Sequence, residues 1–365
     1  MYEKDFTVID SFSGAGGLSL GLQQAGLNIK LAFDNNKYAV ETYGKNFRHP
    51  VLLESIENIN GNDLLKSVGL KRGELSLLAG GPPCQGFSVQ RRGEDKDARN
   101  SLVLEYARLI EELKPTFFLM ENVTGIKNKR GASYVQEILE LVTKMGYHTQ
   151  METLNAADYG VPQSRKRVFI VGEKPINDRV FFEFPKKKYQ PENYRTVRDA
   201  IFDLPTPPED FSDHPLYPNH RKERLSEMNR IRISHVPQGG GREFIPEELR
   251  LECHKVSVEK AGHRYVYGRL AWDEPAGTIT ARFDSFTRGK FAHPVENRSI
   301  TLREGARLQT FKDDFVFSGT KVEVAKQIGN AVPPLLAESL GYAFTEALRK
   351  RKEFNRSENR AYVYN

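Results

Sequence analysis

Short apolar runs alternate with amphipathic segments along the first half of the chain. The runs have the length and β-rich composition of buried strands and lie at Phe6–Phe12, Ile29–Phe33, Leu75–Ala79, Thr116–Met120 and Arg167–Val171. Between them, apolar residues recur at helical spacing over Leu18–Ala25, Asn100–Leu113 and Tyr134–Met145. This alternation predicts an α/β fold with a doubly wound, largely parallel sheet and right-handed crossovers.

The alternation fades after about residue 186. The following stretch begins with three lysines, is rich in proline and contains the triple glycine 239–241. Such a change in texture predicts a boundary and a second, smaller and irregular domain over residues 186–301. The charged tail from 349 to 365 is expected to be frayed.

Composition narrows the class of protein only partly. The 365 residues are 39% hydrophobic and 28% charged, as in a soluble globular protein, and no apolar run has the length of a membrane-spanning helix. The start of the chain lacks a signal-peptide pattern, and Cys84 and Cys253 are too few for a disulfide framework. We therefore expect a reducing, cytoplasmic location. The net charge of +6 is compatible with a polyanionic partner but does not identify one.

A rigid turn carries one of the two cysteines. Gly80-Gly81 ends an apolar strand, the two prolines that follow fix the backbone, and Cys84 comes next. The carboxyl ends of parallel strands are where open α/β sheets bind ligands, so this thiol is well placed to act as a nucleophile. A buried, inert cysteine is the alternative, and the turn alone does not decide between them.

A glycine turn follows the first predicted strand. Ser13–Gly17 leads into a helix, and Asp34 follows the next strand. Glycines let the backbone approach a ligand, and a carboxylate in this position can accept ribose hydroxyls, which suggests an adenosine-type cofactor. Ser19 stands where the dinucleotide fingerprint requires its third glycine. This departure argues against a nicotinamide-dependent dehydrogenase.

Glu121 ends the strand that begins at Thr116 and therefore reaches the same edge of the sheet as Cys84. A carboxylate there is commonly a helix cap or a solvated surface group. Its pairing with a rigidly held thiol favours a functional role for both.

Six segments together resemble the DNA (cytosine-5)-methyltransferases that use S-adenosylmethionine. They occur in the family's order over most of the chain, and they read Asp10-Ser-Phe-Ser-Gly-Ala-Gly-Gly17, Gly80-Gly-Pro-Pro-Cys-Gln-Gly-Phe-Ser88, Glu121-Asn-Val123, Gln163-Ser-Arg-Lys-Arg167, Arg303-Glu-Gly-Ala-Arg-Leu-Gln309 and Gln327-Ile-Gly-Asn-Ala-Val-Pro-Pro334. The resemblance implies a catalytic and cofactor-binding domain over 1–185, completed by 302–348, with 186–301 as the target-recognition domain.

The resemblance also assigns residues to the cofactor, S-adenosylmethionine, with Asp34 at the ribose. The implied set is Phe12, Gly14, Gly16, Asp34, Ile56, Asn330 and Val332. Ser55 stands where family members often carry aspartate, and Asp63 is nearby but off register, which leaves the adenine contact open. Ser76 stands where the strand before the cysteine often begins with aspartate.

The family's chemistry gives the catalytic residues their roles. Cys84 would add to C6 of cytosine, and Glu121 would hydrogen-bond N3 and the exocyclic amine and deliver a proton to N3. Arg167 would contact the cytosine O2, and Arg165 would support the loop or a phosphate.

The target carbon is inaccessible inside a duplex, so the base is expected to flip out of the stack. The polar loop 88–101 is expected to close over DNA, and shortening it should weaken DNA binding and turnover but not cofactor binding. The residues expected to contact DNA are Ser88, Arg91, Arg92, Arg99, Arg269, Thr278, Thr280 and Arg282. No metal is expected, because Cys253-His254 and the distant His263 lack paired ligand spacing.

The resemblance favours a bacterial modification enzyme that acts as a monomer on a specific double-stranded DNA sequence in the cytoplasm. A restriction endonuclease acting on the same site is a possible partner. An RNA cytosine-5 methyltransferase and a catalytically silent DNA-binding protein are the alternatives. Retention of both Cys84 and Glu121 argues against the silent protein.

Overall fold

The protein is described by a computed structural model over residues 6–83, 101–252 and 265–363. The chain forms two units. Unit 1 comprises Met1–Asn155, Lys166–Lys187 and Pro334–Asn365, and unit 2 comprises Ala156–Arg165 and Lys188–Pro333. The division differs from the expected domains after residue 301, because 302–333 belong to unit 2 and only the segment from Pro334 onward returns to unit 1.

Unit 1 is built on a seven-stranded sheet in the order β3-β2-β1-β4-β5-β7-β6. The strands are β1 (Thr7–Ser11), β2 (Asn28–Asp34), β3 (Val51–Leu53), β4 (Leu77–Gly80), β5 (Phe117–Val123), β6 (His148–Asn155) and β7 (Lys166–Glu173). The first five are mutually parallel, whereas β7 runs antiparallel to both β5 and β6. The predicted α/β fold and largely parallel sheet are confirmed, and the reversed β7 is a feature that the sequence pattern did not predict.

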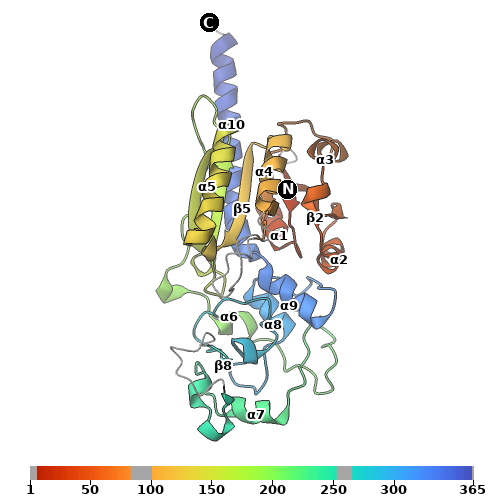
Figure 1. Ribbon diagram of the computed structural model, residues 1–365, viewed down its shortest axis with the longest axis vertical. Helices are drawn as coiled ribbons and strands as arrows, with labels where there is room; N and C mark the ends of the chain where they lie inside the picture. The colour runs from red at the N-terminus through yellow and green to blue at the C-terminus, as the bar shows by residue number, and fades with distance from the viewer. Residues whose placement is uncertain (1–5, 84–100, 253–264, 364–365) are drawn as a thin grey trace. The chain divides into compact units, whose positions relative to one another are not determined.

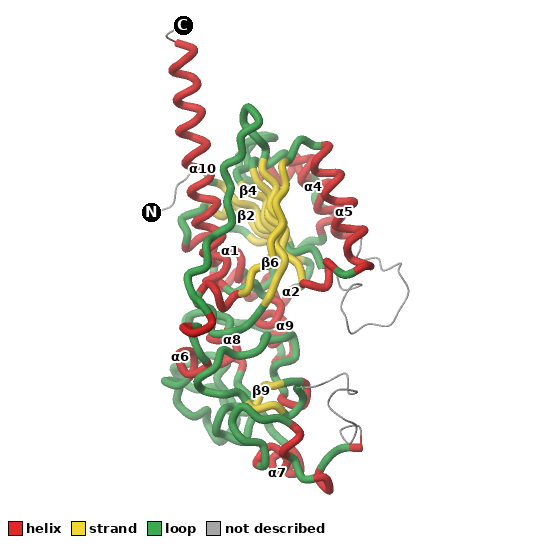
Figure 2. Tube along the Cα trace, turned by 90° about the vertical axis from the view of Figure 1, so that its left-hand side faces the viewer, coloured by secondary structure: helices red, strands yellow, loops and turns green. Residues whose placement is uncertain are grey.

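Helices cover both faces of this sheet, as the edge-on view in Figure 2 shows. α1 (Gly17–Gln24) and α10 (Pro334–Val363) pack together on one face, and α4 (Ser101–Leu113) and α5 (Lys129–Lys144) lie on the other. α2 (Lys37–Asn46) packs beside β2 and β3, and α3 (Gly61–Ser67) packs against α4. Apolar side chains are buried on both faces of the sheet, which explains why its central strands are apolar along their length.

The carboxyl-terminal helix corrects the expectation of a frayed tail. α10 continues without a break through residues 349–363, and its end extends beyond the other elements of unit 1 (Figure 1). Gly21 of α1 permits its close packing, since a Cβ there would lie 2.3 Å from the Pro334 carbonyl oxygen. Arg351 of α10 pairs with the buried Glu173, which ties the helix to the end of β7.

Unit 2 has short regular elements. They are α6 (Val197–Ile201), α7 (Glu227–Ser234), α8 (Leu302–Leu308), α9 (Lys321–Asn330), β8 (Gly268–Arg269) and β9 (Lys290–Ala292). Much of its order comes from side chains that bind main-chain groups rather than from a sheet.

A buried ion pair holds the amino end of α8. Two nitrogens of Arg298 donate to the two carboxylate oxygens of Glu304, each at 2.8 Å, and Thr301 and Glu304 form a reciprocal cap. Burial opposes the charge of Glu304, but the Arg298 guanidinium overcomes this effect and lowers its pKa to about 2. The pair is therefore ionised at neutral pH.

Among the helices of residues 6–83, 101–252 and 265–363, none is long and apolar enough to span a membrane.

Candidate active site

The site begins at the carboxyl edge of the parallel strands, where β1 passes into a glycine turn. Phe12, Gly14 and Gly16 have positive φ angles of 52°, 53° and 95°. A Cβ on Gly16 would approach the Phe47 ring to 2.4 Å, whereas a Cβ on Gly14 would meet nothing within 4 Å. One side of the turn is thus pressed against α2 and the segment after it, and the other side is open to a ligand.

Asp34, at the end of β2, holds this turn in place. Its Oδ2 accepts the Gly14 N–H at 2.9 Å, and its Oδ1 accepts the Asn36 N–H at 2.8 Å. Burial raises the pKa of this carboxyl, although both hydrogen bonds oppose the shift. Each oxygen keeps a second lone pair, so these bonds leave the predicted ribose contact chemically available.

A chain of hydrogen bonds lies beneath the turn. Ser19 Oγ donates to Asp10 Oδ2 at 2.6 Å, Tyr43 OH donates to Ser19 Oγ at 2.6 Å, and His49 Nε2 lies 2.7 Å from Tyr43 OH. Sequence reasoning missed this chain. Its one signal was Ser19, a buried hydroxyl at the position where a dinucleotide site would have glycine.

Glu121 and Arg167 form the second part of the site. Glu121 lies in β5 and Arg167 in the antiparallel β7, and Arg167 Nε is 3.0 Å from Glu121 Oε1. Their side chains are 13% and 15% exposed, and Arg167 also donates to the Lys166 carbonyl. The pair is partly shielded from water while staying accessible at the sheet edge.

The turn that leads to Cys84 is fixed beside this pair. Asn122 Nδ2 donates to the Pro82 carbonyl at 3.0 Å, and a Cβ on Gly81 would lie 3.2 Å from Glu121 Oε2. Tyr106 supports the turn from below, because its buried hydroxyl contacts the carbonyl oxygens of Leu78 and Leu119 in β4 and β5. Cys84 itself lies outside the described residues, as do Ser88, Arg91, Arg92 and Arg99.

Other predicted cofactor residues are placed as follows. Phe12 packs against the core of unit 1, and Ile56 is within that core at 1% exposure, so its side chain offers little surface to a ligand. Asn330 ends α9 and is exposed, and Val332 is buried. Both belong to unit 2, and their assignment to the cofactor stays a prediction.

Arg165 is buried within unit 2, where it contacts the main chain. It is fully buried, and Nη1 donates to the Ile279 carbonyl at 2.9 Å. Thr278 Oγ1 donates to the carbonyl of Ser164, the residue before Arg165, so Thr278 lies beside the segment that contains Arg165. Of the two supports that were expected from Arg165, this geometry fits the loop rather than a phosphate.

Arg269 corrects a prediction. We expected it to contact DNA, but it is 3% exposed, and its guanidinium makes five hydrogen bonds within unit 2. Four go to main-chain carbonyls and one to Asn297, which uses all five donors. Arg269 thus organises the fold of unit 2 and has no donor left for a base. Thr280 is exposed, and Arg282 is half-buried beside Asp284.

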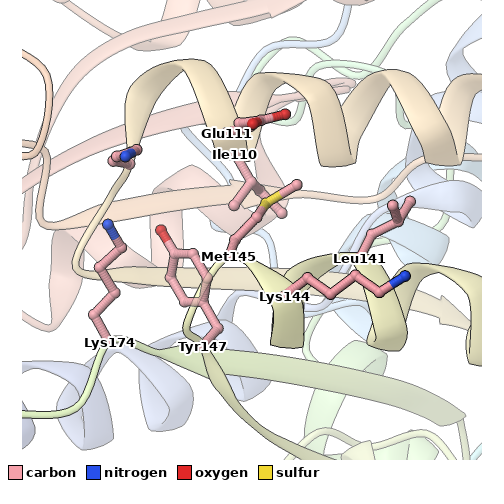
Figure 3. A pocket seen from close by; sticks show the side chains of 8 residues that line it. Ile110, Glu111, Leu141, Lys144, Met145, Tyr147 and Lys174 are labelled. Carbon is pink, nitrogen blue, oxygen red and sulfur yellow. The ribbon is translucent and has the colours of Figure 1, made fainter.

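A cavity of about 370 Å³ lies at the end of the sheet where β5 begins, opposite this site. Figure 3 shows side chains that line it. Its wall includes the ends of α4 and α5 together with Tyr147 and Lys174. Two of the lysines that line it, Lys114 and Lys144, lie at the carboxyl ends of α4 and α5, where cations complement the helix dipole. The position and lining separate it from the carboxyl-edge site. Among the described residues, no group of three or more His, Cys, Asp and Glu side chains is arranged to hold a metal.

The sheet, with a glycine turn and an acidic residue at its carboxyl edge, defines the class of Rossmann-like α/β methyltransferases. Residues 6–346 match the model of the C-5 cytosine-specific DNA methylases, and the chain belongs to this family of DNA cytosine-5 methyltransferases.

Individual relatives span nearly the whole chain. Type II methyltransferase M1.HphI of Haemophilus parahaemolyticus is 36% identical over 94% of this chain and 87% of its own length. Type II methyltransferase M.DdeI of Desulfomicrobium norvegicum is 35% identical over 91% of this chain and 87% of its own. A crystal structure described as a DNA modification methyltransferase encoded within a prophage (E. coli) is 30% identical, with a TM-score of 0.68 over 94% of this chain and 99% of that one.

Proposed function

We propose that this enzyme transfers a methyl group from S-adenosylmethionine to C5 of a flipped cytosine within a specific duplex DNA sequence. The observation that carries this proposal is the Glu121–Arg167 ion pair beside the Asn122–Pro82 hydrogen bond. It brings an acid and a cation to the turn from which the chain continues to Cys84.

The glycine turn suits the proposed cofactor. Gly14 leaves open space above the backbone, and Asp34 offers acceptor lone pairs beside it. When bound, S-adenosylmethionine supplies an electrophilic methyl group on a sulfonium. The turn and Asp34 would hold its adenosine part.

Covalent attack by Cys84 on the cytosine ring would require an acid, and Glu121 is proposed to supply the proton. The thiolate forms a bond to C6 of cytosine while N3 takes a proton from Glu121, which leaves C5 electron-rich. Arg167 would hold the cytosine O2 and offset charge that develops on the ring. After C5 gains the methyl group, the C5 proton would pass to solvent, the N3 proton would return to Glu121, and cleavage of the S–C6 bond would restore the aromatic base and the thiolate.

Access to C5 requires that the base leave the duplex. Loop 88–101 is proposed to close on the DNA, with Arg91, Arg92 and Arg99 at phosphates. In unit 2, Thr280 and Arg282 keep exposed surface for DNA contact. Arg269 is excluded from this set by its burial.

The names of the relatives support a role in restriction–modification, in which methylation of self DNA would protect it from an endonuclease of the same specificity. Such an enzyme would work in the cytoplasm. A monomer would be sufficient, because the methyl acceptor is a single base.

Transfer of labelled methyl from S-adenosylmethionine, followed by digestion and identification of the labelled nucleoside, tests the reaction. We expect label in 5-methylcytosine from duplex DNA. Cys84→Ala should abolish it, and Cys253→Ala, a matched control, should retain it. Label in another nucleoside would refute the Cys84 mechanism. Label in RNA but not in DNA would make the enzyme an RNA methyltransferase.

A further inference from the structure

The hydrogen-bond chain under the glycine turn ends on a carboxyl group that is incompletely satisfied. Asp10 is 1% exposed, and its Oδ2 accepts from Ser19. Its other oxygen, Oδ1, is buried and has no hydrogen-bond partner among the residues that the structure describes. A buried carboxylate in this situation is unfavourable unless it takes up a proton or meets a positive charge.

The described residues around Asp10 supply no such charge. The titratable groups that face it are Asp34 from β2, Tyr43 from α2 and Tyr106 from α4, with His49 at the far end of the hydrogen-bond chain. Burial lowers the pKa of His49 to about 4, so this ring is neutral at pH 7. Among these groups none is a cation at neutral pH, and the neighbouring Asp34 carboxyl further disfavours a negative charge on Asp10.

The hydrogen-bond chain supports the glycine turn directly. Asp10 lies in β1 before the turn and Ser19 in α1 after it, so their hydrogen bond closes the turn from below. The Tyr43 ring stacks on Phe47, with centroids 4.2 Å apart, and both rings press against Gly16. With a neutral His49 as donor, every hydrogen bond in the chain points toward Asp10 Oδ2, which leaves Oδ1 as the position for a proton.

We propose that Asp10 releases a proton when a positively charged ligand binds at the glycine turn. In the free protein at pH 7, part of the Asp10 population is the neutral acid. In the bound form Asp10 is the carboxylate, and the proton passes to the solvent. The inference rests on the proposed use of S-adenosylmethionine, whose sulfonium carries the positive charge.

The titration of Asp10 supports this assignment. Burial raises its pKa to about 7, with a smaller contribution from Asp34 and an opposing one from Ser19. A nearby cation would lower this value, because it favours the charged form. The product of methyl transfer is a neutral thioether, so it should release less of this proton. Asp10 would then act as a positioning residue that favours the cationic cofactor over its product as pH rises.

Calorimetry measures the effect directly. The enthalpies of binding of S-adenosylmethionine and of S-adenosylhomocysteine are measured at pH 7 in phosphate and in Tris, two buffers with different ionisation enthalpies. The difference between the binding enthalpies in the two buffers gives the number of protons released. Because the ligand's amino group can also titrate, the informative quantity is the change between wild type and Asp10→Asn. We expect about 0.5 proton of Asp10-dependent release with S-adenosylmethionine and clearly less with S-adenosylhomocysteine.

Controls separate this inference from the function on which it rests. Asp178→Asn, an exposed carboxyl elsewhere in unit 1, should leave proton release unchanged. Tyr43→Phe keeps the ring but removes the hydroxyl, and it should move the release to higher pH because Ser19 becomes a weaker donor. Binding with equal proton release in wild type and Asp10→Asn would overturn the role of Asp10 but leave the cofactor assignment intact. Absence of binding to folded wild-type protein would overturn the proposed cofactor itself.

Discussion

Arg167 Nε lies 3.0 Å from Glu121 Oε1 across the antiparallel pair β5–β7. In the strand register Arg167 faces Val123, so the contact with Glu121 is diagonal and spans two residues of β5. Antiparallel strands place such diagonal neighbours within reach of long side chains. The reversed orientation of β7 therefore brings the arginine to the carboxyl edge of the sheet.

Glu121→Gln should lower the rate of methyl transfer by about 10²–10⁴-fold, because the amide cannot deliver a proton to the base. Single-turnover assays on duplex DNA would measure the rate, and calorimetry with S-adenosylmethionine should show unchanged affinity. Glu105→Gln, which removes a carboxylate from a surface ion pair of α4, is the matched control and should keep full activity. A Glu121→Gln enzyme with an unchanged rate would rule out the acid role.

Gly16→Ala should destabilise the protein by about 2–5 kcal/mol and abolish cofactor binding. The added Cβ would overlap the Phe47 ring, and φ of 95° is strained for alanine. Gly26 has φ of 92° but open space around its Cβ position, so Gly26→Ala should cost only about 1 kcal/mol and preserve binding. Urea unfolding and calorimetry provide the two readouts. Equal effects of the two substitutions would contradict steric closure of the turn by α2.

Arg269→Met should unfold unit 2 more readily, with a loss of about 3–5 kcal/mol, because five acceptors lose their donor and three of these hydrogen bonds are buried. Arg288, an exposed arginine of the same unit, provides the comparison. Arg288→Met should leave the free energy of unfolding within about 0.5 kcal/mol of wild type. Urea unfolding monitored by the single tryptophan, Trp272, which lies in unit 2, measures both. Normal stability with a selective loss of DNA affinity in Arg269→Met would restore the original prediction that it contacts DNA.

Acid should destabilise unit 2 through Glu304. The folded-state pKa of about 2 lies below the ordinary value of 4.5, so the carboxylate contributes stability above pH 4.5 and loses it as pH falls toward 2. The loss should reach about 3 kcal/mol. Glu304→Gln should be less stable than wild type at pH 7 yet show a shallower fall between pH 4.5 and 2. Parallel pH profiles for the two proteins would refute this assignment.

Local patterns predicted the core strands and the glycine turn, because each of these depends on neighbouring residues. Ser13–Gly17 is recognisable as a turn from its glycines alone, and β1, β2, β4 and β5 are recognisable from their apolar runs. The same reasoning failed for Arg269, because an arginine in an irregular segment has the same sequence appearance whether it faces solvent or main-chain carbonyls.

The sequence by itself determined the family, the α/β class and the positions of Cys84, Glu121 and Arg167, since ordered motifs are a property of the chain. Tertiary structure alone decided the antiparallel course of β7, the pairing of Glu121 with Arg167, the Asp10–His49 chain and the placement of residues 302–333 in unit 2. These features join residues that are distant in sequence. Their partners are selected by strand direction and by the burial of polar groups, and neither leaves a periodic signal along the chain.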